Sequence, residues 1–186
     1  MYAALRQHIE KVVALTDEEF DFVSAQFVIK KFSRRQYLFQ EDEPVHYTYF
    51  VVKGLLKLTL NDETGNEHIL AFAMEDWWES DFQAFYRQSK ATMALQCLEN
   101  TEVLCLSLAG YNNLCSKLPA MVYFFLVKAN GGHVSAQQRI LSLLKGNATQ
   151  RYEEFVKRYP SLVQRVPKRL LASYLGVSRE TLSRLY

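Results

Sequence analysis

The chain has 186 residues, of which 49% are hydrophobic and 13% aromatic, so it can form one large domain or two small ones with packed cores. Its formal net charge is only +2. No apolar run approaches the roughly 20 residues of a membrane-spanning helix, and the first residues lack the apolar segment of a signal peptide, so we expect a cytoplasmic protein without a membrane partner.

The N-terminal 25 residues are expected to be helical. Thr16-Asp-Glu-Glu19 matches a capping box, in which the Thr hydroxyl and the Glu carboxylate accept from unpaired backbone N–H groups at a helix start. From Gln26 the pattern changes to short β-prone runs separated by turn residues. The runs are residues 27–32, 36–40, 49–60, 68–73, 91–98 and 103–106. Several short strands within about 80 residues favour an antiparallel sandwich or barrel.

The longest β-prone run has a period of two. Leucines at positions 56, 58 and 60 alternate with Leu55, Lys57 and Thr59, which predicts one face on a core and the other nearer water. Residues 61–66 then form a polar hairpin loop before the chain returns through the run at 68–73.

A long helix is expected from Pro119 to about Leu144, since proline is well tolerated in a first helical turn. Steps of 3, 4, 3 and 4 relate five small or apolar residues: Val122, Phe125, Ala129, Gly132 and Ala136. This heptad-like pattern favours a homodimer seam, and close approach of a partner helix would offset the cost of Gly131 and Gly132, roughly 1 kcal/mol each. The alternative is a helix that packs on its own domain. Residues 146–149 end the helix, and 150–158 form another short one that ends at Tyr159-Pro160.

The charge of the chain is unevenly distributed. Residues 145–186 hold nine Lys or Arg and three Glu, a balance of 9 − 3 = +6, which leaves 2 − 6 = −4 for the other residues. A basic C-terminal module that meets a polyanion would have this asymmetry, although a merely solvated basic face would look similar.

Residues 166–186 have the pattern of two short helices joined by a tight turn. Gly176 stands where the turn needs a positive φ, and Ser178 is a natural N-cap for the second helix. The apolar residues of this segment are expected to form the core between the helices, with Ala172 small enough for close contact. They are Leu170, Leu171, Ala172, Tyr174, Val177, Leu182 and Leu185, with Thr181 beside them.

Such a helix-turn-helix can place the start of its second helix in the major groove of double-stranded DNA. Arg179, Glu180 and Arg184 are the candidates to contact bases, because arginine can pair with guanine and glutamate can accept from cytosine. Ser178, Thr181 and Lys168 are better placed for phosphates. The alternative is an ordinary helical hairpin.

Residues 172–184, ASYLGVSRETLSR, resemble the helix-turn-helix of the Crp/Fnr family of transcription regulators, and YFVVKG at 49–54 is similar to the family's strand-turn signature. The resemblance implies that Arg179, Glu180 and Arg184 contact bases. It also implies an α+β fold: an antiparallel, jelly-roll-like β-roll sensor domain (1–118), a long dimerisation helix (119–145) and a helix-turn-helix DNA-binding domain (146–186).

Members of that family that bind cyclic AMP use a Gly-Glu pair followed about ten residues later by Arg-Ser or Arg-Thr. Ser80-Asp81 and Ala91-Thr92 align with these positions. Ala91 cannot replace the arginine that pairs with the cyclic phosphate, so we expect control by cyclic AMP to be absent. Aromatic residues crowd this region, which indicates either a pocket for a small-molecule effector of unidentified chemistry or a fold filled by its own side chains. They are Trp77, Trp78, Phe82, Phe85 and Tyr86.

Two other classes of function remain for comparison. A metal-dependent β-roll enzyme needs clustered ligands, but no His-x-His occurs and Cys97, Cys105 and Cys115 form no Cys-x-x-Cys pair. We therefore expect no metal, no cofactor and no enzyme activity.

A signalling module that binds a ligand or protein without DNA is the second class, and the helix-turn-helix pattern argues against it. The sequence stops at Tyr186, soon after the recognition helix begins, so we expect either a shortened recognition helix or a natural chain that continues beyond this residue.

Overall fold

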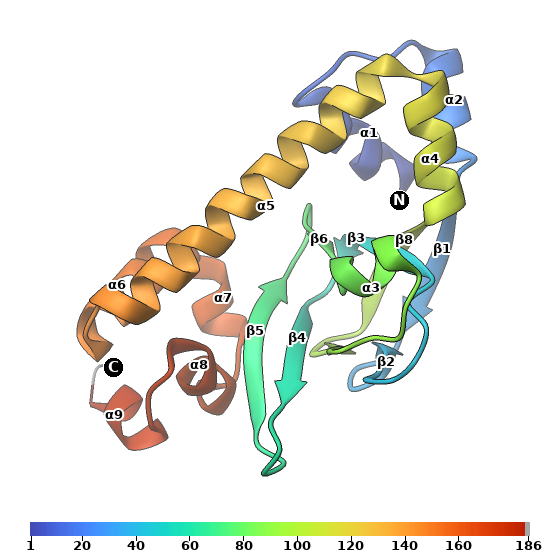
Figure 1. The fold of residues 1–186 in the computed structure, drawn as a ribbon. Coiled ribbons are helices and arrows are strands. Elements are labelled where there is room, and N and C mark those ends of the chain that lie inside the picture. Colours follow the sequence, from blue (N-terminus) through green and yellow to red (C-terminus); the bar gives the residue numbers. More distant parts are fainter. Residues whose placement is uncertain (185–186) are drawn as a thin grey trace. The chain divides into compact units, whose positions relative to one another are not determined.

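The computed structural model describes residues 1–184 and contains two compact units (Figure 1). The N-terminal unit comprises residues 1–60 and 71–128, and the C-terminal unit comprises residues 61–70 together with the chain from Ala129 onwards. Leu185, which we expected in the second helix of the turn motif, lies outside the described residues. No helix in the described part of the chain is both long and apolar enough to cross a membrane.

Within residues 1–184, eight strands form two antiparallel sheets, which confirms the predicted β-roll. The strands are β1 (Phe27–Phe32), β2 (Tyr37–Phe39), β3 (Tyr47–Lys53), β4 (Leu56–Asn61), β5 (Glu67–Ala73), β6 (Trp78–Glu79), β7 (Ala94–Cys97) and β8 (Thr101–Ser107). One sheet has the order β1-β8-β3-β6 and the other β2-β7-β4-β5. Phe50 of β3 lies opposite Leu104 of β8, and Leu58 of β4 lies opposite Leu95 of β7.

Helices precede and follow the sheets in the N-terminal unit. They are α1 (Tyr2–Glu10), α2 (Asp17–Ser24), α3 (Phe82–Arg87), α4 (Leu108–Lys117) and the first part of α5 (Pro119–Lys145). The capping box predicted at Thr16 is confirmed, because the Thr16 hydroxyl accepts from the Glu19 amide at 3.2 Å and the Glu19 carboxylate accepts from the Thr16 amide at 2.8 Å. Pro119 is the first residue of α5, as expected.

The first sheet is covered on both faces. Tyr49 and Val51 of β3 belong to a core cluster shared with Leu56 and Leu95 of the other sheet. Phe50, between them, belongs to a second cluster with residues of α1, α2, α4 and α5, the helices gathered near the start of α5 in Figure 1. Successive side chains of a strand point to opposite faces, so one continuous apolar strand supplies both clusters.

The β-prone run at 49–60 forms two strands, with a turn at Gly54, where the sequence resembles a strand-turn signature. Gly54 separates β3 from β4 with a φ of 108°, and a Cβ at this position would lie 2.5 Å from the Thr101 hydroxyl oxygen. Our expectation that Lys57 and Thr59 lie nearer water is wrong, since they are only 5% and 2% exposed. Alternation of residue types shows which side chains are polar, but it does not show whether other groups cover them.

Four short elements were absent from the sequence prediction. These are β6, α3, α4 and α7 (Pro160–Arg165). Pro160 occupies the first turn of α7, so the Tyr159-Pro160 pair both ends one helix and begins the next. Because β6 has two residues and α3 and α7 six each, these elements are too short to show a hydrophobic period.

The C-terminal unit holds the second part of α5 and four shorter helices. Besides α7 these are α6 (Ala148–Arg158), α8 (Lys168–Leu175) and α9 (Arg179–Ser183). Its buried residues come from β5 and from the segment of α6 to α9: Ile69, Phe155, Leu162, Val166, Leu170, Leu171, Ala172, Leu175 and Leu182. Leu175 was missed as a core residue, whereas Tyr174 and Val177, expected in the core, are only half-buried.

His8 of α1 lies in the second core cluster of the N-terminal unit. Its ring contacts Phe50 and Phe124, with centroids 4.8 and 5.7 Å away, and its Nε2 accepts from the Trp78 indole N–H at 3.2 Å. The other ring nitrogen has no hydrogen-bond partner and lies 3.8 Å from the Asp76 carboxylate. Burial, together with the nearby Lys128, lowers the pKa of His8 to about 4.

The free energy of unfolding is expected to fall as the pH is lowered from about 6.5 to 4. In that range the unfolded chain, with the ordinary histidine pKa of 6.5, binds a proton that the folded chain excludes until about pH 4. The stabilisation is complete above pH 6.5, and its loss amounts to at most about 3 kcal/mol. Urea unfolding of wild type and His8→Gln between pH 4 and 7.5 measures it. Equal pH slopes for the two proteins would contradict this role of His8.

Candidate DNA-binding surface and effector region

The turn between α8 and α9 has the geometry of a helix-turn-helix. Gly176 adopts a left-handed conformation with a φ of 65°, and the Val177 amide donates to the Ala172 carbonyl at 3.0 Å, which closes the end of α8. Ser178 then caps α9, accepting from the Thr181 amide at 3.1 Å. Both local predictions, the positive φ at Gly176 and the N-cap at Ser178, are confirmed.

The residues expected to contact bases lie on the outer side of α9. Arg179, Glu180 and Arg184 are exposed, with Arg184 at the C-cap. Hydrogen bonds from its own amide and from the Ser178 hydroxyl lower the pKa of Glu180, so it is an acceptor at neutral pH. Leu182, on the opposite side, is fully buried and fixes α9 to its unit. The helix therefore presents two cations and one acceptor to its surroundings.

The residues expected to contact phosphates differ in their surroundings. Lys168 is exposed at the start of α8. Thr181 is half-buried, and its hydroxyl lies 3.1 Å from the Ser178 hydroxyl, so these two groups hydrogen-bond each other within the helix cap. Any contact of Ser178 or Thr181 with a phosphate would have to be made in addition to the cap.

Part of the positive charge of the C-terminal unit is used internally. The Arg151 Nε donates to the Leu175 carbonyl at 2.8 Å, and Arg151 also donates to the Gly146 carbonyl. Arg158 donates to the Ser135 hydroxyl at 3.2 Å and lies over the Tyr159 ring. The charge balance of the sequence therefore includes two arginines whose guanidinium groups donate hydrogen bonds within the unit.

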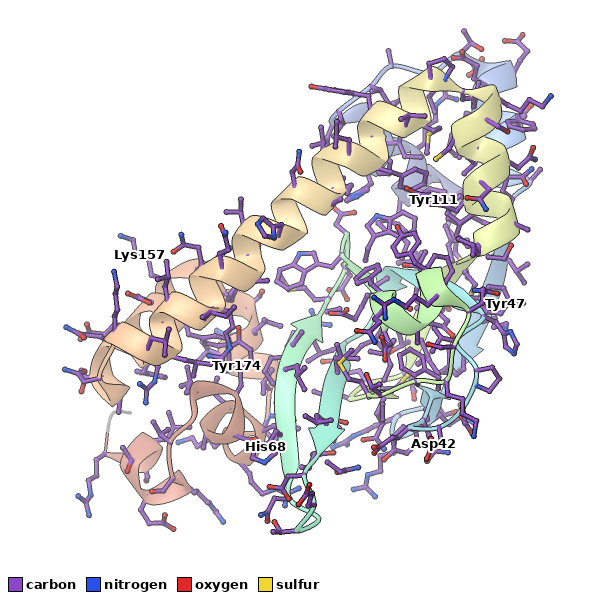
Figure 2. The ribbon with its side chains drawn as sticks, in the orientation of Figure 1. Asp42, Tyr47, His68, Tyr111, Lys157 and Tyr174 are labelled. Carbon is purple, nitrogen blue, oxygen red and sulfur yellow. The ribbon has the colours of Figure 1, made fainter. Side chains whose placement is uncertain are left out.

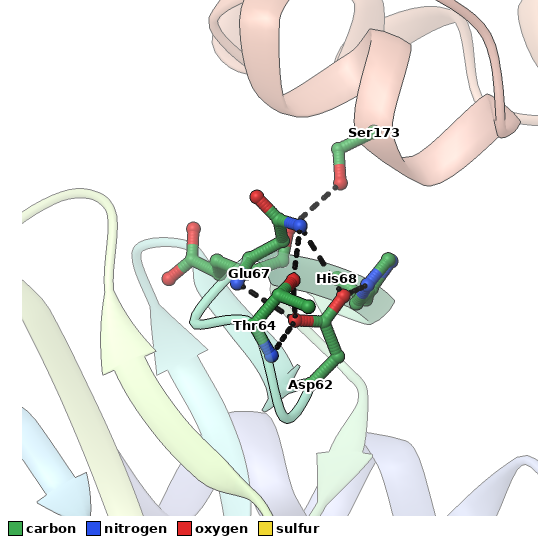
Figure 3. A network of polar contacts seen from close by, with 6 residues as sticks. Asp62, Thr64, Glu67, His68 and Ser173 are labelled. Carbon is green, nitrogen blue, oxygen red and sulfur yellow. Dashed lines mark hydrogen bonds and ion pairs between the residues drawn. The ribbon is translucent and has the colours of Figure 1, made fainter.

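A hairpin loop within the C-terminal unit is organised around one carboxylate. Asp62 accepts from the Thr64 amide and the Asn66 amide, both at 2.9 Å, and lies 2.8 Å from the His68 Nε2 (Figure 3). The Thr64 hydroxyl also donates to Asp62, and these bonds lower the pKa of Asp62. The sequence predicted the polar loop, but not the contact that it makes with α8: the Ser173 hydroxyl donates to the Glu67 carbonyl at 3.3 Å.

The four positions aligned with the cyclic-nucleotide cassette lie in the N-terminal unit, where their polar groups bond to the protein. Asp81 is fully buried, accepts from the Ala84 amide at 3.0 Å as the N-cap of α3, and accepts from the amide and hydroxyl of Thr92 at 2.9 and 3.0 Å. Ser80 donates to the Tyr47 carbonyl at 2.9 Å. Ala91 is 3% exposed, and its amide donates to the Glu43 carbonyl.

Glu79 is a titratable residue of this region that the sequence analysis did not single out. It lies half-buried on β6 beside Ser80, whose amide donates to its carboxylate at 3.0 Å. Burial raises the pKa of Glu79 to about 7. Nothing in the sequence marks this glutamate, because its pKa depends on which groups surround a two-residue strand.

The aromatic residues of this region divide into a buried and an exposed set. Phe85 is fully buried, and Trp78 packs against Phe50 and Phe124 of the core. Phe82 and Tyr86, on α3, are 42% and 51% exposed. Phe85 is therefore a core residue, whereas Trp77 and Trp78 are half-buried. Among residues 1–184 no group of three histidine, cysteine or carboxylate side chains could hold a metal ion.

The exposed face of α5 differs from the seam expected from the sequence. Phe125 is half-buried and packs against Tyr111, with centroids 4.5 Å apart, so it faces its own unit. A regular exposed stripe runs beside it with steps of 4, 3, 4, 3, 4 and 3. The stripe consists of Val122, Leu126, Ala129, His133, Ala136, Ile140 and Leu143. Four residues of the expected seam are also exposed, namely Val122, Ala129, Gly132 and Ala136, whereas Leu126 is exposed where the expected seam has the half-buried Phe125.

A β-roll followed by one long helix and a helix-turn-helix defines a class of protein in which a sensor fold and a DNA-binding motif share one chain. The comparisons with known proteins agree with this class. Residues 29–117 match the family described as the cyclic nucleotide-binding domain. The transcriptional regulatory protein btr of Bordetella pertussis is 27% identical over 165 residues, covering 82% of this chain and 67% of its own.

Solved structures share the fold at lower identity. FixK2 from Bradyrhizobium japonicum superposes with a TM-score of 0.75 at 19% identity and covers 86% of this chain and 82% of its own. The catabolite activator protein of Thermus thermophilus gives a TM-score of 0.57 at 21% identity and covers 92% of this chain and 82% of its own. In sequence and fold the chain is therefore similar to these regulators, and its helix-turn-helix resembles that of the Crp/Fnr family.

Proposed function

We propose that the chain is a transcription regulator of the Crp/Fnr family, that it acts in the cytoplasm as a homodimer that binds a two-fold symmetric DNA site through α9, and that it needs no cyclic AMP to do so. The observation that carries the DNA-binding part is the exposure of Arg179, Glu180 and Arg184 on a helix that directly follows a left-handed turn. In this arrangement arginines reach guanine and glutamate accepts from cytosine. Lys168, Ser178 and Thr181 are assigned to phosphates.

The homodimer is supported by the exposed stripe of α5. Leu126 and Ile140 are 54% and 56% exposed, and a regular apolar stripe of this length is costly to leave in water. A heptad period suits a second copy of the same helix. Two copies related by a two-fold axis would present their recognition helices about 34–36 Å apart, which is one turn of DNA.

Independence from cyclic AMP is supported by the bonds of the degenerate cassette. Asp81 and Thr92 satisfy each other, and Ala91 provides no cation for a phosphate. A buried cyclic phosphate would then lack its charge-assisted partner. We therefore infer that DNA binding by this chain is either regulated by a signal other than cyclic AMP or constitutive.

Replacing Arg179 with alanine tests the assignment of base contacts. The affinity for the preferred duplex is expected to fall about 5- to 150-fold, or 1–3 kcal/mol, and the preference at one base position to relax. Lys168→Ala is the matched control: it should weaken binding to all sequences alike and reduce the salt dependence by about one counterion. Fluorescence anisotropy titrations at several salt concentrations measure both. An equal loss on every sequence for Arg179→Ala would contradict base contact.

A signalling module that binds a ligand or a protein without specific DNA contact is the second candidate. For such a module neither Arg179→Ala nor Lys168→Ala would change a sequence preference, because wild type would have none.

A further inference from the structure

The last turn of α8 is held by three different parts of the C-terminal unit, through three consecutive residues. The Ser173 hydroxyl donates to the Glu67 carbonyl of the hairpin at 3.3 Å (Figure 3). The Arg139 guanidinium of α5 donates to the Tyr174 carbonyl, and the Arg151 Nε of α6 donates to the Leu175 carbonyl at 2.8 Å. This turn lies directly before Gly176, where the chain bends toward α9.

These contacts complete the hydrogen bonding of a helix end. The final carbonyls of a helix have no partner within the helix, and positive charge there is favourable because of the helix dipole. The carbonyls of Ala172 and Ser173 accept from the amides of Val177 and Gly176 at 3.0 and 3.1 Å. The next two carbonyls accept from the two arginines. Each of the last four carbonyls of α8 therefore has a donor.

Arg139 is packed as well as hydrogen-bonded. Its guanidinium carbon lies 3.8 Å from the centroid of the ring of Tyr174, the residue labelled in Figure 2. That ring in turn contacts the ring of Phe155 of α6, with centroids 5.4 Å apart. Burial lowers the pKa of Arg139, the direction expected for a cation withdrawn from water, although it remains charged at neutral pH. A planar cation can donate to a carbonyl and stack on a ring at the same time, which lysine cannot do equally well.

We propose that Arg139 is a positioning residue for DNA recognition: it fixes the last turn of α8, and through Gly176 the angle at which α9 presents its side chains. Arg139 itself touches no DNA. The inference rests on the proposed function, because it concerns the sequence preference of α9. Arg139 lies on α5, the helix whose exposed stripe is proposed to pair with a second copy of the chain. One helix would then serve both dimer assembly and the positioning of the recognition turn.

Loss of this contact should lower specific binding more than non-specific binding. Base contacts require each side chain to keep its place within a fraction of an ångström, whereas phosphate attraction tolerates displacement. Removing a hydrogen bond from a charged donor is expected to lower the affinity for the preferred duplex about tenfold. Binding to random duplex should stay within about twofold, and the salt dependence should not change, because no phosphate contact is lost.

The experiment compares Arg139→Ala and Arg139→Lys with Lys145→Ala, which removes an exposed cation from the same helix. Amide hydrogen exchange in the free proteins reports the turn directly. The Gly176 and Val177 amides should exchange at least tenfold faster in Arg139→Ala, less so in Arg139→Lys, and as in wild type in Lys145→Ala. Affinities for preferred and random duplexes at several salt concentrations complete the comparison.

Unchanged exchange at Gly176 and Val177 would overturn the proposal, as would a salt dependence reduced by about one counterion in Arg139→Ala, which would mean that Arg139 contacts a phosphate. Faster exchange spread evenly over α6 to α9 would also contradict a local role. Absence of sequence preference in wild type would be a failure of the proposed function instead, and the exchange data would still decide whether Arg139 holds the turn.

Discussion

Ile140→Glu is expected to convert the protein from a dimer to a monomer and to lower its affinity for a palindromic duplex by about 10²- to 10⁴-fold. Ile140 is 56% exposed in the single chain and is the sixth of the seven residues of the exposed stripe of α5. Two glutamates facing each other across a seam would replace apolar contact with like-charge repulsion. A monomer loses the second half-site, whose contribution acts through a high effective concentration.

Gln138→Glu is the matched control for this variant. Gln138 is exposed on the same helix but lies off the stripe, so the same charge is added without touching the proposed seam. Sedimentation velocity gives the mass and anisotropy gives the affinity. Because both positions are exposed, neither substitution should change the free energy of unfolding of the single chain by more than about 0.5 kcal/mol. A dimeric Ile140→Glu, or a monomeric wild type, would contradict the proposed interface.

Asp81→Ala is expected to lower the free energy of unfolding by about 3–4 kcal/mol. The carboxylate is fully buried and accepts three hydrogen bonds, from the Ala84 amide and from the amide and hydroxyl of Thr92. Alanine would leave these donors without an acceptor, and an unsatisfied buried donor costs about 1–3 kcal/mol. These bonds also connect the start of α3 to Thr92, eleven residues along the chain from Asp81, so the variant would lose more than a helix cap.

Thr16→Ala provides the comparison, because Thr16 caps α2 in the same unit from an exposed position. Its loss should cost about 1 kcal/mol. Urea unfolding of the three proteins at pH 7 gives the values. Were Asp81 a ligand for an effector rather than a structural acceptor, Asp81→Ala would unfold like wild type and would change only ligand binding.

Features set by a few neighbouring residues could be predicted from the sequence. The capping box at Thr16, the positive φ of Gly176 and the cap at Ser178 depend on contacts between residues at most five apart, so their residue types identify them. The two-sheet architecture was also predictable, because a period of two and regular turns survive in most of its strands.

Features that depend on packing could not be predicted. Phe125 and Leu126 both fit an apolar period on α5, and only the contact of Phe125 with Tyr111 decides which of them remains exposed. The Asp81–Thr92 bonds were hidden because the same residues align with a ligand cassette. Arg151 was counted only as part of the basic C-terminal region, and nothing in the sequence distinguishes Arg139 from an ordinary surface arginine. Both nevertheless donate hydrogen bonds to carbonyls of α8, 35 residues away for Arg139 and 24 residues away for Arg151.

The most direct test of the account is selection and sequencing from a pool of randomised duplexes at fixed salt, with and without cyclic AMP. The account predicts enrichment of one palindromic motif, with half-sites about one helical turn apart, to the same extent in both conditions. Enrichment only in the presence of cyclic AMP would contradict independence from that nucleotide. No enrichment in either condition would contradict the assignment of α9 to sequence recognition.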